Sequence, residues 1–176
     1  MTPEQTGPPK LLTQKRREFC FENGYLLLEK LLSEDWIARL WEATEEMIEN
    51  SRSITKSDAI WDLDKGHTAA NPQLRRLSSM NDHHPDFWDY ASSAASPLPD
   101  VIADLVGPDV KFHHSKLNFK WSKGGEEVKW RQDISFWPHT NYTPCTAGTY
   151  IFDGTGEQSP WVFSAQPQGS GRRPVQ

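Results

Sequence analysis

The chain has 176 residues, 36% of them hydrophobic, and a formal net charge of −5. This length fits one domain with a buried core, and the mild acidity argues against a general nucleic-acid surface. The N-terminal residues lack the apolar segment of a signal peptide, and no apolar run is long enough to span a bilayer. Cys20 and Cys145 form neither a disulfide framework nor a zinc motif. We therefore expect a cytoplasmic protein that binds neither nucleic acid nor membranes.

The first part of the chain predicts helices. Residues 1–10 contain three prolines and are expected to form a flexible arm. Thr13 suits the N-cap of a helix that ends at Gly24. The apolar residues 25–32 predict a short buried strand, and Ser33 then opens a second helix with apolar residues at intervals of three and four. These apolar residues are Trp36, Ile37, Leu40, Trp41, Ala43, Met47 and Ile48.

The middle of the chain is more irregular. Residues 51–82 are polar and predict loops with short extended pieces. A short helix is expected after Pro85, and another from Pro99 to the residue before Gly107. His83 and His84, before the first of these helices, are expected to face solvent.

Alternation of side chains then replaces helical periodicity. Strands are predicted at 110–121, 128–137 and 146–153, with the adjacent His113 and His114 on opposite sides of the first strand. Helices followed by strands predict an α+β fold, in which helices cover an antiparallel sheet or barrel.

The residues that carry chemistry lie in the strand predicted at 128–137. Trp130, Gln132 and Asp133 precede the run Phe136-Trp137-Pro138. This pattern, together with the order of the predicted helices and strands, resembles the phytanoyl-CoA dioxygenase family of iron(II)/2-oxoglutarate-dependent oxygenases. The resemblance covers residues 12–158.

The resemblance implies a partial oxygenase domain at 11–158, with N-terminal helices packed on a double-stranded β-helix (a cupin-like jelly roll). It also implies an oxidoreductase that hydroxylates an unactivated carbon of a small organic or acyl substrate. Its cofactors would be Fe(II) and 2-oxoglutarate, and its co-products succinate and CO₂.

The family holds iron with two histidines and one carboxylate on one face of the metal. The resemblance assigns the carboxylate to Asp133, while Arg131 stands where the first histidine is expected. A guanidinium group has no lone pair for a metal. The second histidine is expected well downstream, but the last histidine of the chain is His139.

The resemblance also assigns residues around the metal. Arg76 and Lys116 resemble the basic residues that bind the carboxylate of 2-oxoglutarate. No residue is assigned as a catalytic acid or base. The aromatic residues expected to line a substrate pocket are Trp130, Phe136 and Trp137.

The sequence predicts an incomplete barrel. A closed jelly roll needs about eight strands, whereas four or five are predicted here. Residues 159–176 are rich in glycine and proline and are expected to form a disordered tail outside the family pattern, as truncation or a frame change would produce. Exposed strand edges would then favour self-association.

Two other hypotheses remain. The chain is a catalytically inactive remnant, in which Asp133 pairs with Arg131 or Lys116 and the aromatic residues form core. A carbohydrate-binding β-sandwich rich in aromatic residues is the third hypothesis, but it does not explain the helices of the first half.

Overall fold

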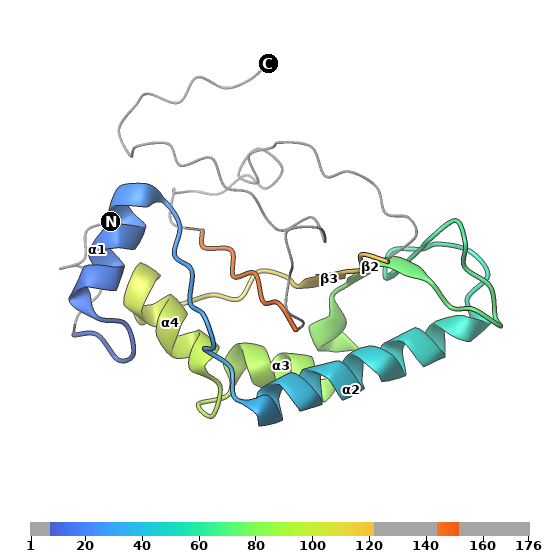
Figure 1. Ribbon diagram of the computed structural model, residues 1–176, viewed down its shortest axis with the longest axis horizontal. Coiled ribbons are helices and arrows are strands. Elements are labelled where there is room, and N and C mark those ends of the chain that lie inside the picture. Colours follow the sequence, from blue (N-terminus) through green and yellow to red (C-terminus); the bar gives the residue numbers. More distant parts are fainter. Residues whose placement is uncertain (1–7, 122–143, 152–176) are drawn as a thin grey trace, which may run out of the picture.

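The computed structural model describes residues 8–121 and 144–151 (Figure 1). Helices and a small antiparallel sheet alternate along the chain, which confirms the mixed helix-and-strand class. No helix in the described residues is both long and apolar enough to cross a membrane. The elements are α1 (Gln14–Asn23), α2 (Glu34–Asn50), η2 (Ser51–Ser53), β1 (Trp61–Leu63), β2 (Leu74–Ser78), η3 (Met80–Asp82), α3 (Pro85–Ser92), α4 (Pro97–Val106) and β3 (Lys116–Asn118).

Both N-terminal helices start at the predicted residues, and α1 also ends at the predicted Gly24. The Thr13 hydroxyl accepts a hydrogen bond from the backbone N–H of Arg16 at 3.3 Å, and Gly24 ends α1 in the left-handed conformation (φ 81°). Ser33 caps α2 in the same way, through the backbone N–H of Trp36. These caps satisfy helix-end groups that otherwise have no intrahelical partner.

The apolar face predicted for α2 is the face that the helix buries. Four of its members are buried, namely Trp36, Leu40, Ala43 and Met47. The same helix keeps its acidic residues on the opposite side, so its pattern separates core from solvent.

The next two helices depart slightly from prediction. His84 caps α3, because its Nδ1 accepts a hydrogen bond from the backbone N–H of Asp86 at 3.2 Å. Its side chain is only 13% exposed, so the prediction that His84 faces solvent was wrong. The other helix, α4, begins at Pro97, two residues early, because Ser96 supplies the N-cap and proline suits the first helical position.

The sheet has the order β1-β2-β3, with antiparallel neighbours. Its register is irregular between β1 and β2: Asp62 pairs with Arg76, but Leu63 pairs with Leu74. One residue of β2, Arg75, is therefore extra, as in a β-bulge. As a result Leu74 and Leu77, three residues apart, are both fully buried.

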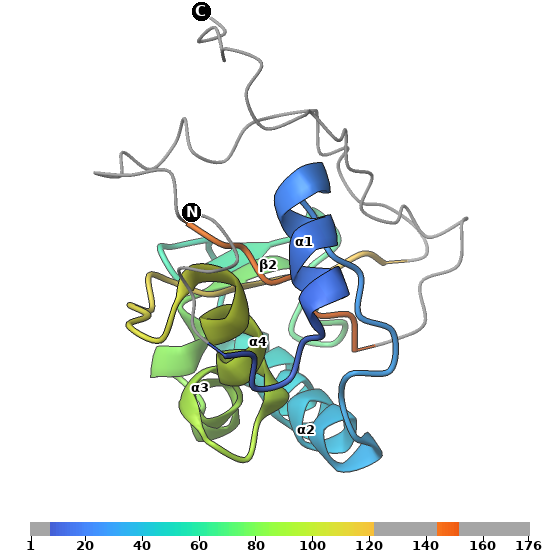
Figure 2. The same ribbon diagram turned by 90° about the vertical axis from the view of Figure 1, so that its left-hand side faces the viewer.

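The main core lies between the sheet and α2 and α3. It joins Leu40 and Met47 of α2, Phe87 of α3 and the two β2 leucines. Figure 2 shows α2 and α3 side by side beneath the sheet, with α1 standing next to α4. One face of the sheet is thus covered by helices.

A second cluster joins the start of the chain to α4. Leu12 packs on Val101 and Leu105. The buried carboxylate of Asp104 accepts hydrogen bonds from the backbone N–H groups of Lys10, Leu11 and Leu12, at 2.7 to 2.8 Å. The predicted flexible arm, residues 1–10, is therefore tied down at its last residue.

Two predicted strands are absent or shortened. Residues 25–32 form no strand, because Lys30 adopts a left-handed conformation (φ 54°) that an extended strand does not allow. Leu26, Leu28 and Leu31 pack on the second cluster and Leu32 packs on the main core, while Leu27 is 70% exposed. The strand predicted at 110–121 shrinks to 116–118. Its partner β2 ends at Ser78, because Ser79 is also left-handed (φ 53°).

The remaining strand predictions fall in or near the undescribed part. The strand predicted at 128–137 lies outside the described residues. Residues 146–151, the described part of the third strand, form no ladder with any described segment. They are held by a hydrogen bond of 2.7 Å between Tyr90 and Thr149 and by packing of Ile151 on the core.

Candidate functional site

Two of the predicted site residues fall within the described structure. Arg76 lies on β2 and Lys116 on β3, the next strand of the sheet. The predicted metal ligand and pocket residues lie outside the described residues, as does the residue at the position of the first histidine. These are Asp133, Trp130, Phe136, Trp137 and Arg131.

The sheet brings Arg76 and Lys116 to one face. Arg76 is paired with Asn118, and Ser78 with Lys116. Because alternate strand residues point to the same side, these four side chains share a face, and directly opposed residues lie about 5 Å apart at Cβ. Two cations 40 positions apart in the chain are therefore near neighbours.

This face of the sheet is opposite the helices. The intervening pair, Leu77 and Leu117, points into the core beneath it. We call the four residues Arg76, Ser78, Lys116 and Asn118, together with Asp62 of β1, the polar face. Its residues come from all three strands, and the helices that pack on the other face of the sheet hold these strands in place.

One carboxylate of the polar face, Asp62, binds two arginines. Asp62 accepts hydrogen bonds on Oδ2 from Nε and Nη2 of Arg75, at 3.0 and 2.6 Å, and from Nη2 of Arg76 at 3.0 Å. Its side chain is 18% exposed, against 45% for Arg76. The bulge makes this possible, because it brings two consecutive arginines to the same acid.

The described part of the chain contains no cluster of side chains that could hold a metal ion. No three of its histidine, cysteine, aspartate and glutamate residues are grouped to hold an ion. The exposed His113 and His114 have their Nδ1 atoms 2.5 Å apart. The prediction that they face opposite sides was wrong, because residues 110–115 do not form a strand.

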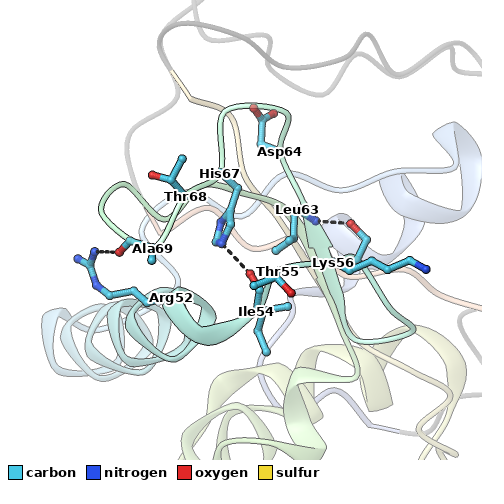
Figure 3. A pocket seen from close by; sticks show the side chains of 10 residues that line it. Arg52, Ile54, Thr55, Lys56, Leu63, Asp64, His67, Thr68 and Ala69 are labelled. Atoms are coloured by element: carbon cyan, nitrogen blue, oxygen red, sulfur yellow. Dashed lines mark hydrogen bonds between the residues drawn. The ribbon is translucent and has the colours of Figure 1, made fainter.

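A hollow of about 440 Å³, lined by polar and apolar residues, lies beside the end of β1 (Figure 3). His67 stands in its wall, where Nδ1 accepts a hydrogen bond from the N–H of Gln73 and Nε2 donates to the carbonyl of Ile54. The Arg52 guanidinium donates hydrogen bonds to Glu49 and to the carbonyls of Ala69 and Ala70. These hydrogen bonds hold two loops together, so His67 and Arg52 have a structural role in the wall of the hollow. The polar composition of residues 51–82 predicted loops but not this hollow.

The half-buried Cys20 does not provide a nucleophile. Burial raises the pKa of its thiol above the ordinary value. At neutral pH it is therefore protonated, and a thiol attacks far less readily than a thiolate. Cys20 is therefore not a candidate for a catalytic acid, base or nucleophile.

A model of the family described as phytanoyl-CoA dioxygenase matches residues 21–171. The chain belongs to the phytanoyl-CoA dioxygenase family. The match includes α2, the whole sheet and the segment around Asp133. It extends past residue 158, where the resemblance drawn from the sequence motifs ended.

Relatives of this family member are oxygenases by name. A probable alpha-ketoglutarate-dependent hypophosphite dioxygenase of Stutzerimonas stutzeri is 26% identical over 151 residues, which are 85% of this chain and 50% of that protein. Ectoine dioxygenases of Sphingopyxis alaskensis and Stutzerimonas stutzeri are each 29% identical over 116 residues, or 65% of this chain and 35% of those proteins. The chain thus spans half or less of these relatives.

The described residues fit one of the two cofactors that the family implies. Arg76 and Lys116 present a forked guanidinium and an ammonium on one face, which suits a dicarboxylic acid such as 2-oxoglutarate. For iron, the described residues offer no ligand set, and the assigned carboxylate, Asp133, lies outside them.

Proposed function

We propose that this protein is an iron(II)/2-oxoglutarate-dependent dioxygenase chain that acts on an unactivated carbon of a small organic or acyl substrate. The observation that carries the proposal is the position of Arg76 and Lys116 on the same face of the sheet. Membership of the family and the names of the relatives support the same reaction class.

Each basic residue has a distinct part in the proposal. The Arg76 guanidinium is held by Asp62 at one of its nitrogens and can present its other N–H groups to a carboxylate in a fixed plane. Lys116 lies opposite Ser78, the next residue after Arg76 on the same face of β2, and adds a compact positive charge there. When bound, iron(II) would bring 2-oxoglutarate and O₂ together; decarboxylation of the acid to succinate and CO₂ would supply two electrons and the substrate C–H bond the other two, with one oxygen atom entering succinate and one entering the hydroxylated product.

The metal ligand of the proposal is Asp133. Arg131 would place a permanent positive charge beside it, two residues away on the same side of a strand. We therefore expect iron to bind more weakly than in a family member with a histidine there, and turnover to be impaired.

Calorimetric titration of the metal-free protein with 2-oxoglutarate tests the acid-binding part of this proposal. Arg76→Ala and Lys116→Ala are each expected to weaken binding by about tenfold or more, since hydrogen bonds to charged groups contribute about 1.5–3 kcal/mol. Lys56→Ala, which removes an exposed lysine outside the sheet, is the matched control. Unchanged affinity in both sheet variants would refute the assignment.

A second candidate is a catalytically inactive protein that retains only small-molecule binding. The presence of Arg131 at the first histidine position favours it. Anaerobic addition of Fe(II) and 2-oxoglutarate separates the two, through the visible charge-transfer band and the succinate formed in air. Iron-dependent succinate would exclude the inactive protein, whereas binding without band or succinate would establish it. Arg131→His alone is not expected to restore turnover, since the second histidine is still lacking.

A further inference from the structure

Three polar residues surround the point where β3 begins. Ser79 follows β2, Asn81 lies in η3 and Ser115 precedes β3. The Ser79 backbone N–H donates to the Ser115 carbonyl at 2.9 Å, and the Ser115 hydroxyl donates to Oδ1 of Asn81 at 2.5 Å. The Asn81 backbone N–H lies 3.4 Å from the same hydroxyl oxygen. We call these three residues the clasp.

The backbone of Ser79 makes the clasp possible. Its left-handed conformation (φ 53°, ψ 38°) ends β2 and turns the chain into η3. The turn carries Asn81 back to Ser115, 34 residues later in the chain. The Asn81 side chain is oriented as well, since its Nδ2 donates to Asp82 at 2.7 Å and leaves Oδ1 for the Ser115 hydroxyl.

The clasp holds the residue immediately before Lys116. At the other end of β3, the Phe119 N–H donates to the Arg75 carbonyl at 3.1 Å and the Trp121 indole N–H donates to the Leu74 carbonyl at 2.7 Å. A strand of three residues has few ladder bonds of its own, so these contacts at both ends set its register. The register in turn places Lys116 opposite Ser78 and on the same face as Arg76.

We propose that Ser79, Asn81 and Ser115 are positioning residues, which hold Lys116 where its ammonium meets a carboxylate of a 2-oxo dicarboxylic acid. This inference rests on the proposed function, because it takes Lys116 as a residue that binds the acid. A lysine side chain has four rotatable carbons and a charge without fixed direction. Its placement therefore depends on the backbone that carries it, and the clasp fixes that backbone.

The test is calorimetric titration of the metal-free protein with 2-oxoglutarate. Ser115→Ala and Asn81→Ala are expected to weaken binding three- to tenfold, although Lys116 is still present. Ser115→Thr retains the hydroxyl and is expected to restore affinity. Ser92→Ala removes a serine hydroxyl that donates to a helix carbonyl far from the sheet, and serves as the matched control.

The Lys116→Ala background distinguishes positioning from general damage. If the clasp acts through Lys116, Ser115→Ala causes no further loss of affinity once the lysine is absent. An equal loss in both backgrounds, or full affinity in Ser115→Ala and Asn81→Ala, would overturn the clasp while leaving the role of Lys116 intact. Affinity that is unchanged by Lys116→Ala would overturn both this inference and the proposed role of Lys116.

Discussion

The Asp104 carboxylate on α4 accepts a hydrogen bond of 2.7 Å from the backbone N–H of Leu12, 92 residues earlier in the chain. The neighbouring N–H groups of Lys10 and Leu11 bind the same carboxylate. A single acid therefore satisfies three donors at the start of the chain and places Leu12 in the cluster with Val101 and Leu105.

Stability is expected to depend on the ionisation of Asp104. Burial raises its pKa, but the three backbone N–H groups and the nearby Arg17 outweigh this effect and lower it overall. A carboxyl whose pKa is lower in the folded state stabilises the fold above its unfolded pKa. That contribution is lost as the pH falls through the lower, folded value.

Asp104→Asn tests this dependence, because an amide nitrogen cannot accept the N–H groups. We expect a loss of about 2 kcal/mol at neutral pH, and a smaller difference from the parent protein in acid. Chemical denaturation at several pH values measures both. Asp100→Asn, at an exposed acid on the same helix, is the control. A loss that does not shrink in acid would contradict this explanation.

The core between sheet and helices predicts a contrast between two leucines. Leu77 is fully buried, whereas Leu27 is 70% exposed. Leu77→Ala is expected to lower the free energy of unfolding by about 2–5 kcal/mol, because it leaves a cavity. Leu27→Ala is expected to change it by less than about 0.5 kcal/mol. Equal effects in urea denaturation would mean that the two sites are equally buried in solution.

Backbone conformation predicts opposite effects at two left-handed residues. Ser79→Gly is expected to stabilise the protein by about 1 kcal/mol, because glycine adopts a positive φ without strain. Gly24→Ala, at φ 81°, is expected to destabilise it by a similar amount, about 1 kcal/mol. Melting temperatures of the two variants compare the effects. A destabilised Ser79→Gly protein would mean that the serine side chain makes a stabilising contact.

The charge of Asp62 predicts how strongly the polar face attracts anions. Removing a unit charge roughly 8 Å from a ligand changes its binding by about 0.5–2 kcal/mol, for effective dielectric constants between about 80 and 20. Asp62→Asn is therefore expected to tighten 2-oxoglutarate binding by about two- to thirtyfold. Weaker binding would show that Asp62 matters more for holding Arg76 than for its charge.

The ends of the sheet predict self-association. Among the described strands, β1 and β3 each have a neighbour on one side only. Unpaired strand edges tend to pair with other chains. Sedimentation velocity across a range of concentrations is expected to show association that increases with concentration. A monomer at all concentrations would show that both edges are protected.

The helices could be predicted from sequence because their signals are local. Thr13, Ser33 and Gly24 act within four residues of their own position, and the apolar face of α2 repeats within the helix. Such signals need no knowledge of distant partners. The same locality explains why α4 was misplaced by only two residues.

The strands could not be predicted as well, because a strand needs a partner. Leu26, Leu28 and Leu31 pack on the cluster that contains Val101 and Leu105 of α4, and an apolar run alone does not show whether it does so as a strand or as an irregular segment. The length of β3 is set by Ser79, 37 residues before it. Arg76 and Lys116 were found through the resemblance to a family, but their common face depends on a register that only the structure gives.

The bulge at Arg75 allows this strand to lose one residue without a change in its buried face. With strict alternation, Leu74 would point to the same side as Arg76, away from the core. Deletion of the single residue Arg75 would remove the bulge and place Leu74 directly before Arg76, so that strict alternation would then keep Leu74 on the core side. An alignment of relatives that opens a one-residue gap at position 75 therefore implies the same interior, with one arginine fewer beside Asp62.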